Sequence, residues 1–325
     1  RWNRKCTSAT PERQAMKPDI KKDFSRFLAA APERLHMAAH SHHYWPDVTF
    51  DAHMQAWTDA AVYADRKWEY IFENIIPEAQ RGVARLLSLP APDNIVFAQN
   101  THEFILRLLS CLPVEKTPHI LTTDGEFHSF DRQIRRLEED NLVAVTRIAI
   151  EPFDSFTARF AQAAQGGAYD MVFFSHVFFN SGFCVPDISA IVAAVKNSDS
   201  FVVIDGYHAF MALPVDWRAL ADRAFYIGGG YKYAMAGEGA CFMYCPPGFG
   251  ARPRNTGWFA GFGALANARD GSIGYGDDAS RFAGATADIS GLYRLCAVMA
   301  WLQKSGIDIS DIHSHAHGLQ KVFAE

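Results

Sequence analysis

The chain has 325 residues, of which 49% are hydrophobic and 13% aromatic, enough to bury a large core in one large or two modest domains. Its formal net charge of −5 argues against a nucleic acid as the partner. No apolar run approaches the roughly 18 residues that a membrane-spanning helix needs, so no membrane contact is expected.

The N-terminal residues and the cysteines indicate the compartment. Residues 1–15 are polar and basic, without the apolar core of a secretory signal. Met16 is a plausible start, so residues 1–15 are expected to be an upstream extension or an expression remnant. Cys241 and Cys245 have a CxxxC spacing but no second cluster, which does not favour zinc. Free thiols in a reducing cytosol are expected, which predicts a cytoplasmic protein.

Helical and strand-like segments alternate along the chain. The pattern predicts one long helical stretch over residues 51–89 with a break at Pro77. Strands are then expected at residues 94–98, 119–122, 143–148, 171–174, 201–204, 225–228 and 240–244. Helices between them are expected at residues 101–112, 129–141, 156–165 and 188–196. This alternation predicts an α/β fold with a mostly parallel, seven-stranded central sheet sandwiched by helices.

An aspartate and a lysine further along the chain form the most informative pair. Asp205 ends the apolar run 201–204, which places a carboxylate at the C-terminal edge of a buried strand, where open α/β sheets bind ligands. Lys232 follows in a glycine-rich, aromatic-flanked loop, where desolvation can remove its proton. Pyridoxal phosphate (PLP) chemistry needs such a pair: a lysine that holds the aldehyde as a Schiff base and an acid that keeps the pyridine nitrogen protonated. A surface lysine and a structural aspartate are the alternative.

The residues around this pair resemble those of a known family. Segments 205–208 (Asp-Gly-Tyr-His) and 230–240 resemble the class V aminotransferase group of fold-type I PLP enzymes. Within that group, the Tyr-Lys-Tyr of residues 231–233 is most similar to the kynureninase branch. The resemblance spans roughly residues 35–300 and implies a fold-type I PLP-transferase that acts on a small α-amino acid.

The resemblance assigns roles in cofactor binding to further residues. Thr101 and His102 open a helix after a strand, where helical N–H groups suit the PLP phosphate; an ordinary N-cap is the alternative. Phe127 matches the ring that stacks on the pyridine in kynureninases. His208 takes the position that hydrogen-bonds the 3′-oxygen of the cofactor, and Tyr231 matches a tyrosine that reaches the phosphate.

The glycine-rich loop over residues 257–276 is too long to be a passive connection. Trp258 resembles a kynureninase tryptophan that helps to bind phosphate. Thr286 resembles a threonine that reaches the phosphate of the neighbouring subunit, although Ala285 replaces the usual glycine. The resemblance therefore implies a homodimer with shared active sites.

Three histidines within four residues raise the question of a metal site: His40, His42 and His43. No cysteine or carboxylate cluster lies nearby in the sequence, and the segment overlays the kynureninase entry motif. We therefore expect no metal, and we expect His40 and Ser41 to form a wall on the substrate side.

The resemblance also implies a domain organisation. Residues 16–50 are expected to form an N-terminal arm and residues 51–265 a large PLP-binding domain. Residues 266–325 are expected to contain a loop, a helix and the truncated start of a small C-terminal α/β domain.

Three hypotheses for function follow. The first is a kynureninase-like enzyme that cleaves a Cβ–Cγ bond hydrolytically, with Lys232, Asp205 and His208 as its catalytic residues. The alternative is a class V aminotransferase, or a cysteine desulfurase or β-lyase, on the same scaffold. The third is a non-catalytic binding protein with a PLP-enzyme fold. The substrate and the reaction type stay open at this point.

Overall fold

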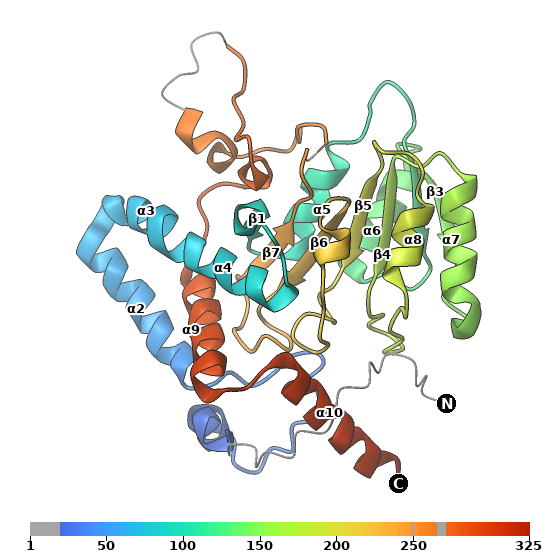
Figure 1. Cartoon of the computed structure of the whole chain (residues 1–325). Helices are drawn as coiled ribbons and strands as arrows, with labels where there is room; N and C mark the ends of the chain where they lie inside the picture. The colour runs from blue at the N-terminus through green and yellow to red at the C-terminus, as the bar shows by residue number, and fades with distance from the viewer. Residues whose placement is uncertain (1–19, 249, 265–270) are drawn as a thin grey trace.

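A seven-stranded sheet lies at the centre of the molecule, in the order β1-β7-β6-β5-β4-β2-β3 (Figure 1). The computed structural model describes residues 20–248, 250–264 and 271–325. β7 runs antiparallel to both of its neighbours, and the other paired strands run parallel. The predicted α/β fold with a mostly parallel sheet is therefore confirmed. The strands are β1 (Ile95–Ala98), β2 (His119–Thr123), β3 (Ala144–Ile148), β4 (Met171–Ser175), β5 (Phe201–Asp205), β6 (Ala224–Gly229) and β7 (Cys241–Tyr244).

Helices cover both faces of the sheet, because most of the strands are runs of β-branched and aromatic residues that are buried on both sides, whereas the edge strand β3 is only partly buried. In β5, Val202 and Ile204 belong to a core cluster with α4, α7, α8 and α9, whereas Val203 belongs to a second cluster with α5 and α6. The helices are α1 (Ser25–Ala30), α2 (Val48–Tyr63), α3 (Lys67–Tyr70), α4 (Ile76–Leu87), α5 (Thr101–Leu109), α6 (His128–Glu139), α7 (Phe156–Gly166), α8 (Ile188–Ala194), α9 (Ser290–Ser305) and α10 (Ile309–Ala324).

The helical stretch predicted over residues 51–89 breaks elsewhere than expected. α2 gives way to a short 3-10 segment at Ala64–Arg66, and α3, a π-helical turn at Ile71–Ile75 and α4 then follow. The φ of 50° at Ala64 ends α2. Pro77 lies in the first turn of α4, where its missing N–H costs no helical hydrogen bond, so the predicted break at Pro77 is wrong. α2 and the run from α3 to α4 diverge from the segment at Ala64–Arg66, and α2 lies alongside α9 (Figure 1).

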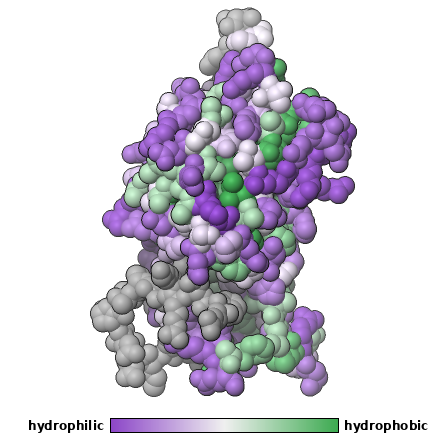
Figure 2. All heavy atoms as spheres, turned by 90° about the vertical axis from the view of Figure 1, so that its right-hand side faces the viewer, coloured by the Kyte–Doolittle hydropathy of each residue, from purple (hydrophilic) through white to green (hydrophobic). Residues whose placement is uncertain are grey.

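Two sides of the molecule differ in surface character. On the α7 side, hydrophilic side chains cover most of the surface and apolar ones form only small groups (Figure 2). On α2, at the opposite side of Figure 1, Phe50, Met54 and Trp57 are 48%, 45% and 69% exposed. Their spacing places them on one face of the helix, and such an apolar face is typical of a protein–protein interface.

The domain boundaries stay predictions. Residues 1–15 and the loop residues 266–270 lie outside the described residues. In the parts of the chain that the structure describes, no helix combines the length and the apolar character needed to cross a bilayer.

Candidate active site

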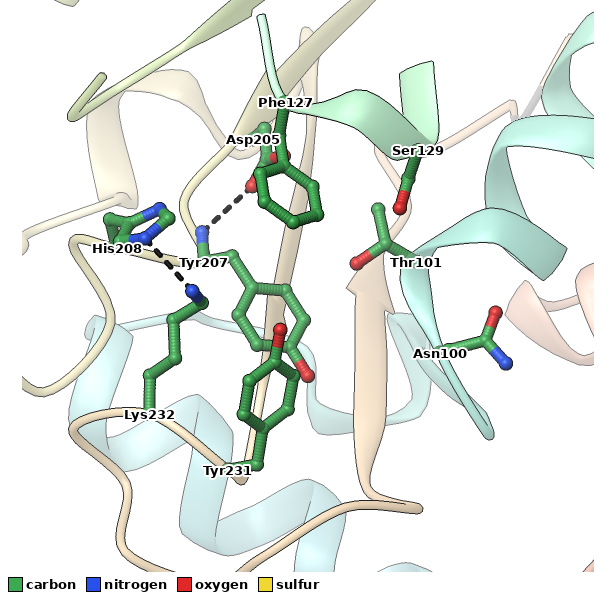
Figure 3. Close-up of a pocket in the computed structure, with 9 residues that line it drawn as sticks. All are labelled: Asn100, Thr101, Phe127, Ser129, Asp205, Tyr207, His208, Tyr231 and Lys232. Atoms are coloured by element: carbon green, nitrogen blue, oxygen red, sulfur yellow. Dashed lines mark hydrogen bonds between the residues drawn. The ribbon is translucent and has the colours of Figure 1, made fainter. Parts of the chain in front are cut away.

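The carboxyl end of β5, the loop after β6 and the first turns of α5 and α6 enclose a pocket (Figure 3). Asp205 ends β5 and is only 6% exposed. Its Oδ1 accepts a hydrogen bond from the backbone N–H of Tyr207 at 2.9 Å. The side chains that line the pocket are those of Asn100, Thr101, Phe127, Ser129, Asp205, Tyr207, His208, Tyr231 and Lys232.

Lys232 lies in the loop that follows β6 and is 5% exposed. Its Nζ is 2.9 Å from Nε2 of His208 and 5.5 Å from the ring centre of Phe127. Burial lowers the pKa of Lys232, although the nearby Asp205 carboxylate opposes this effect. Burial, helped by the charges of Lys232 and His40, lowers the pKa of His208 to about 3. The neutral imidazole of His208 can therefore accept a hydrogen bond from Nζ of Lys232.

The Asp205 carboxyl is suited to a cationic ligand group. Burial raises its pKa to about 6, and the Tyr207 N–H and the Lys232 charge only partly offset that effect. A protonated ring nitrogen placed against this carboxylate would supply the opposite charge that stabilises its ionised form. The Asp205 carboxyl group therefore fits the protonated pyridine nitrogen of PLP.

The first turns of two helices border the same cavity. Asn100 caps α5, where its side chain accepts from the N–H of Glu103 at 3.2 Å, and Thr101 is the first helical residue. α6 begins at His128, and the next residue, Ser129, lines the pocket. The N–H groups and the dipoles of both helices favour an anion there, which fits a phosphate group.

The ring of Phe127 points into the pocket just before α6 (Figure 3). Phe179 packs edge-on against it, with ring centres 5.2 Å apart and an interplanar angle of 90°. His128 contacts both rings, at 5.4 Å and 5.3 Å. These contacts fix the ring of Phe127 against the cavity, as stacking on a flat ligand requires.

The loop after Lys232 has an unusual backbone and is tied down from α9. Met235 and Gly237 have positive φ values of 56° and 73°. The buried guanidinium of Arg294 donates to the carbonyl oxygens of Ala236 at 2.8 Å and Glu238 at 2.6 Å. Arg294 therefore holds the left-handed part of the loop in place, and with it the backbone that carries Lys232.

The comparison with family models matches residues 47–325 to "Aminotransferase class-V". The chain belongs to the class V aminotransferase family. Members of this family use PLP.

Curated relatives of this family member are distant. It is 23% identical over 253 residues to a protein of Vibrio cholerae described as "Probable cysteine desulfurase", an alignment that covers 75% of this chain and 59% of the relative. It is 27% identical over 176 residues to "Isopenicillin N epimerase" of Streptomyces clavuligerus, covering 53% of this chain and 43% of the relative. The chain thus spans less than two thirds of the length of either relative.

Solved structures with a similar fold are also distant from this chain in sequence. The cystine C–S lyase C-DES in complex with cysteine persulfide superposes with a TM-score of 0.70 at 18% identity, covering 85% of this chain and 73% of the lyase. The apo cysteine desulfurase of Thermococcus onnurineus NA1 superposes with a TM-score of 0.73 at 19% identity, covering 93% and 74%. The predicted fold-type I architecture is confirmed. The placement nearest to kynureninases is not supported, because these similar proteins are desulfurases, a C–S lyase and an epimerase.

The structure brings most of the predicted site residues together, but not all of them. Thr101, Phe127, Asp205, His208, Tyr231 and Lys232 line one pocket. His102 is exposed on α5 and points away from it, since only the first residue of that helix lines the cavity. Trp258 and Thr286 do not line the pocket either; Trp258 is 39% exposed and packs on Phe259, with ring centres 4.4 Å apart.

The histidine-rich segment does not line the pocket, but it packs against residues that do. His40 is exposed, and it is close enough to His208 to help lower the pKa of that residue. Oγ of Ser41 lies 3.2 Å from Nδ1 of His42, whose ring packs on Tyr231 with centres 5.2 Å apart. A role of His40 and Ser41 in substrate binding stays a prediction. Within the described ranges, no group of three or more metal-ligating side chains occurs.

Three residues that line the pocket were not predicted as site residues: Asn100, Ser129 and Tyr207. Two buried residues outside the lining, Arg294 and Glu126, were also missed. Arg294 could have been found as the lone charge in the apolar run over residues 291–302. Glu126 directly precedes Phe127 but does not line the pocket, and nothing local in the sequence distinguishes it from a surface acid.

Proposed function

We propose that the chain is the cofactor-binding part of a PLP enzyme that releases a sulfur-bearing β-substituent from an α-amino acid such as cysteine or cystine. One observation carries the PLP part of this proposal. A buried lysine amine, a buried strand-end carboxylate and an aromatic ring, those of Lys232, Asp205 and Phe127, line a single pocket beside two helix N-termini.

Each of these groups has a chemical task. Asp205 would hold the proton on the ring nitrogen, Phe127 would cover one ring face, and the first turns of α5 and α6 would bind the phosphate. Lys232 would attach the cofactor and then move the proton at Cα, for which a lowered pKa suits it. Bound PLP supplies an electron sink for the carbanion at Cα.

The relatives support carbon–sulfur chemistry. The similar proteins include desulfurases and a cystine C–S lyase that was solved in complex with its reaction product, cysteine persulfide. In this chain, Sγ of Cys241 lies 3.7 Å from Oγ1 of Thr101, yet burial raises the pKa of its thiol, which makes it a poor nucleophile. We therefore favour a β-elimination reaction that uses no thiol from this pocket.

Product analysis tests the reaction type. The protein would be loaded with PLP and given cysteine, cystine, kynurenine, or an amino donor with a keto acid. We expect sulfide or persulfide from the sulfur substrates, and Lys232→Ala should form none. Cleavage of kynurenine alone would return the kynureninase hypothesis, and amino transfer alone would return the aminotransferase alternative. Failure to form a borohydride-reducible lysine adduct at Lys232 would leave only the non-catalytic hypothesis.

We also propose a homodimer with shared sites. Trp258 and Thr286 lie away from the pocket of their own protomer and are accessible, as residues that reach a partner's phosphate must be. The apolar face of α2, formed by Phe50, Met54 and Trp57, offers a surface for such an association.

A further inference from the structure

Glu126 is a buried carboxyl group that none of the steps above uses. It lies between β2 and α6, immediately before Phe127, and is 5% exposed. Its side chain does not line the cofactor pocket. A carboxyl group in such a place must either find hydrogen-bond partners and opposite charge or give up its own charge.

The partners of Glu126 are neutral hydroxyl and amide groups. Oε1 lies 2.5 Å from Oγ1 of Thr123 and accepts from the backbone N–H of Ser175 at 3.3 Å. Oε2 lies 2.6 Å from Oγ of Ser175. A hydroxyl oxygen accepts hydrogen bonds as well as donating them, so the Thr123 or Ser175 side chain can accept the hydrogen bond that a protonated carboxylic acid donates.

The charged group that faces Glu126 has the same sign. Thr123 at the end of β2 and Ser175 at the end of β4 are neutral, while Asp205 ends β5, directly beside Ser175 in the strand register. The pKa of Glu126 is raised to about 8, mainly by burial and in smaller part by the Asp205 charge, because the hydrogen bonds from Ser175 and Thr123 offset only part of these effects. At neutral pH the proton therefore stays on Glu126.

We propose that Glu126 is a positioning residue that acts as a neutral carboxylic acid, so that Asp205 carries the single negative charge of this buried pair of carboxyl groups. The same hydrogen bonds tie the turn before α6 to β2 and β4, which fixes the direction in which Phe127 enters the pocket. The link to cofactor binding rests on the proposed PLP function; the charge state of Glu126 does not.

The charge state is tested on the cofactor-free protein. A carboxyl whose pKa is raised on folding, from 4.5 to about 8, stabilises the protein fully only below the lower value. Relative to Glu126→Gln, the folding equilibrium constant of the wild type should fall by up to about tenfold per pH unit between those values and then level off. Asp205→Asn is the matched control, because its corresponding change should end near pH 6.

If the unfolding free energies of the wild type and Glu126→Gln change with pH in parallel above pH 5, Glu126 is not protonated in the folded protein at neutral pH. Infrared spectra at pH 7 give a second readout that does not require reversible unfolding. The carbonyl band of a protonated carboxylic acid should be present in the wild type and absent in Glu126→Gln. Its presence in both proteins, or its absence from both, would equally overturn the assignment.

Cofactor affinity tests the positioning role. Glutamine reproduces the shape and the neutral charge of the acid, so Glu126→Gln should bind PLP within about threefold of the wild type at pH 7. Glu126→Ala leaves two buried hydroxyls without their partner and should weaken PLP binding by about tenfold or more. Equal losses in both variants would show that the site uses a charged Glu126. If the wild type itself binds no PLP, the proposed function fails, while the stability and infrared results still decide the charge state.

Discussion

Two buried ionisable side chains support the pocket from outside its lining, and one of them is charged while the other is neutral. Arg294 stands behind the Lys232 loop and donates to carbonyl oxygens, to Oγ of Ser290 and to Nδ1 of His53. Glu126 stands behind the Phe127 turn and, at neutral pH, holds a proton. An arginine keeps its charge even where burial lowers its pKa, so hydrogen bonds, helped by the nearby Asp288 and Glu238 charges, have to offset the cost of burying it.

The difference shows that hydrogen-bond geometry, not charge, is the common requirement of both supports. A neutral isostere exists for a protonated glutamate, which is glutamine. No side chain without charge offers the five donors of a guanidinium. The two supports should therefore respond differently to conservative substitution.

Asp205 carries the charge that would face the ring nitrogen of the cofactor, so its loss should have the largest effect. Asp205→Ala should weaken PLP binding by about 2–3 kcal/mol, because the ring nitrogen loses its charge partner. Exchange of the Cα proton of a bound amino acid with deuterated water should then collapse, although some PLP still binds. Titration with PLP and proton NMR measure the two effects. Turnover at the wild-type rate in this variant would exclude Asp205 as the residue that holds the ring nitrogen protonated.

Arg294 should not tolerate a conservative change. Arg294→Lys keeps the charge but not the planar fork that reaches the Ala236 and Glu238 carbonyls, so we expect a loss of about 2 kcal/mol in unfolding free energy. PLP affinity should fall with it. Arg223 is the matched control, since it donates to the carbonyls of Ser200 and Asn197 far from the pocket.

Arg223→Lys should lower the stability by a similar amount and leave PLP affinity unchanged. Denaturant unfolding and PLP titration of both variants separate the two effects. If both variants lose cofactor equally, Arg294 supports the fold in general and not the Lys232 loop in particular.

Much of the site was predictable because its main residues follow local rules. Asp205 ends an apolar strand, and the carboxyl ends of parallel strands meet at one edge of the sheet. Lys232 follows the next strand in a glycine-rich loop, so the same edge receives it. The mostly parallel sheet followed from the alternation of helices and strands.

The two supports were not predictable, because each depends on contacts distant in the sequence. Arg294 reaches a carbonyl 58 residues away, and Glu126 reaches a strand end 49 residues away. The break predicted at Pro77 failed for a different reason: proline is compatible with the first turn of a helix, and the turn at Ala64 left no proline or glycine signal.

A substitution at Gly237 tests how closely Trp45, in the N-terminal segment, packs against the Lys232 loop. A Cβ at Gly237 would lie 2.4 Å from Cζ2 of Trp45, and the φ of 73° disfavours any L side chain. Gly306 is the matched control, because its φ is 65° but a Cβ there meets nothing within 4 Å. Gly306→Ala should cost about 1 kcal/mol from backbone strain, and Gly237→Ala about 2–3 kcal/mol, since the clash adds to the strain. Equal unfolding free energies for the two variants would mean that the Trp45 contact yields without cost.

The smallest effect should come from a residue that supports the site of another protomer. Thr286→Ala removes one neutral hydrogen bond to a phosphate, so PLP affinity should fall by about threefold. Mixed with Lys232→Ala, it should recover the wild-type PLP affinity at one site per heterodimer, because that site combines an intact Lys232 from one chain with an intact Thr286 from the other. Arg294 and Glu126 act within their own protomer, so variants of these residues should show no such dependence on Thr286 across the interface. A monomer in sedimentation experiments that binds PLP fully would contradict the shared site, and the exposed face of α2 would then need another partner.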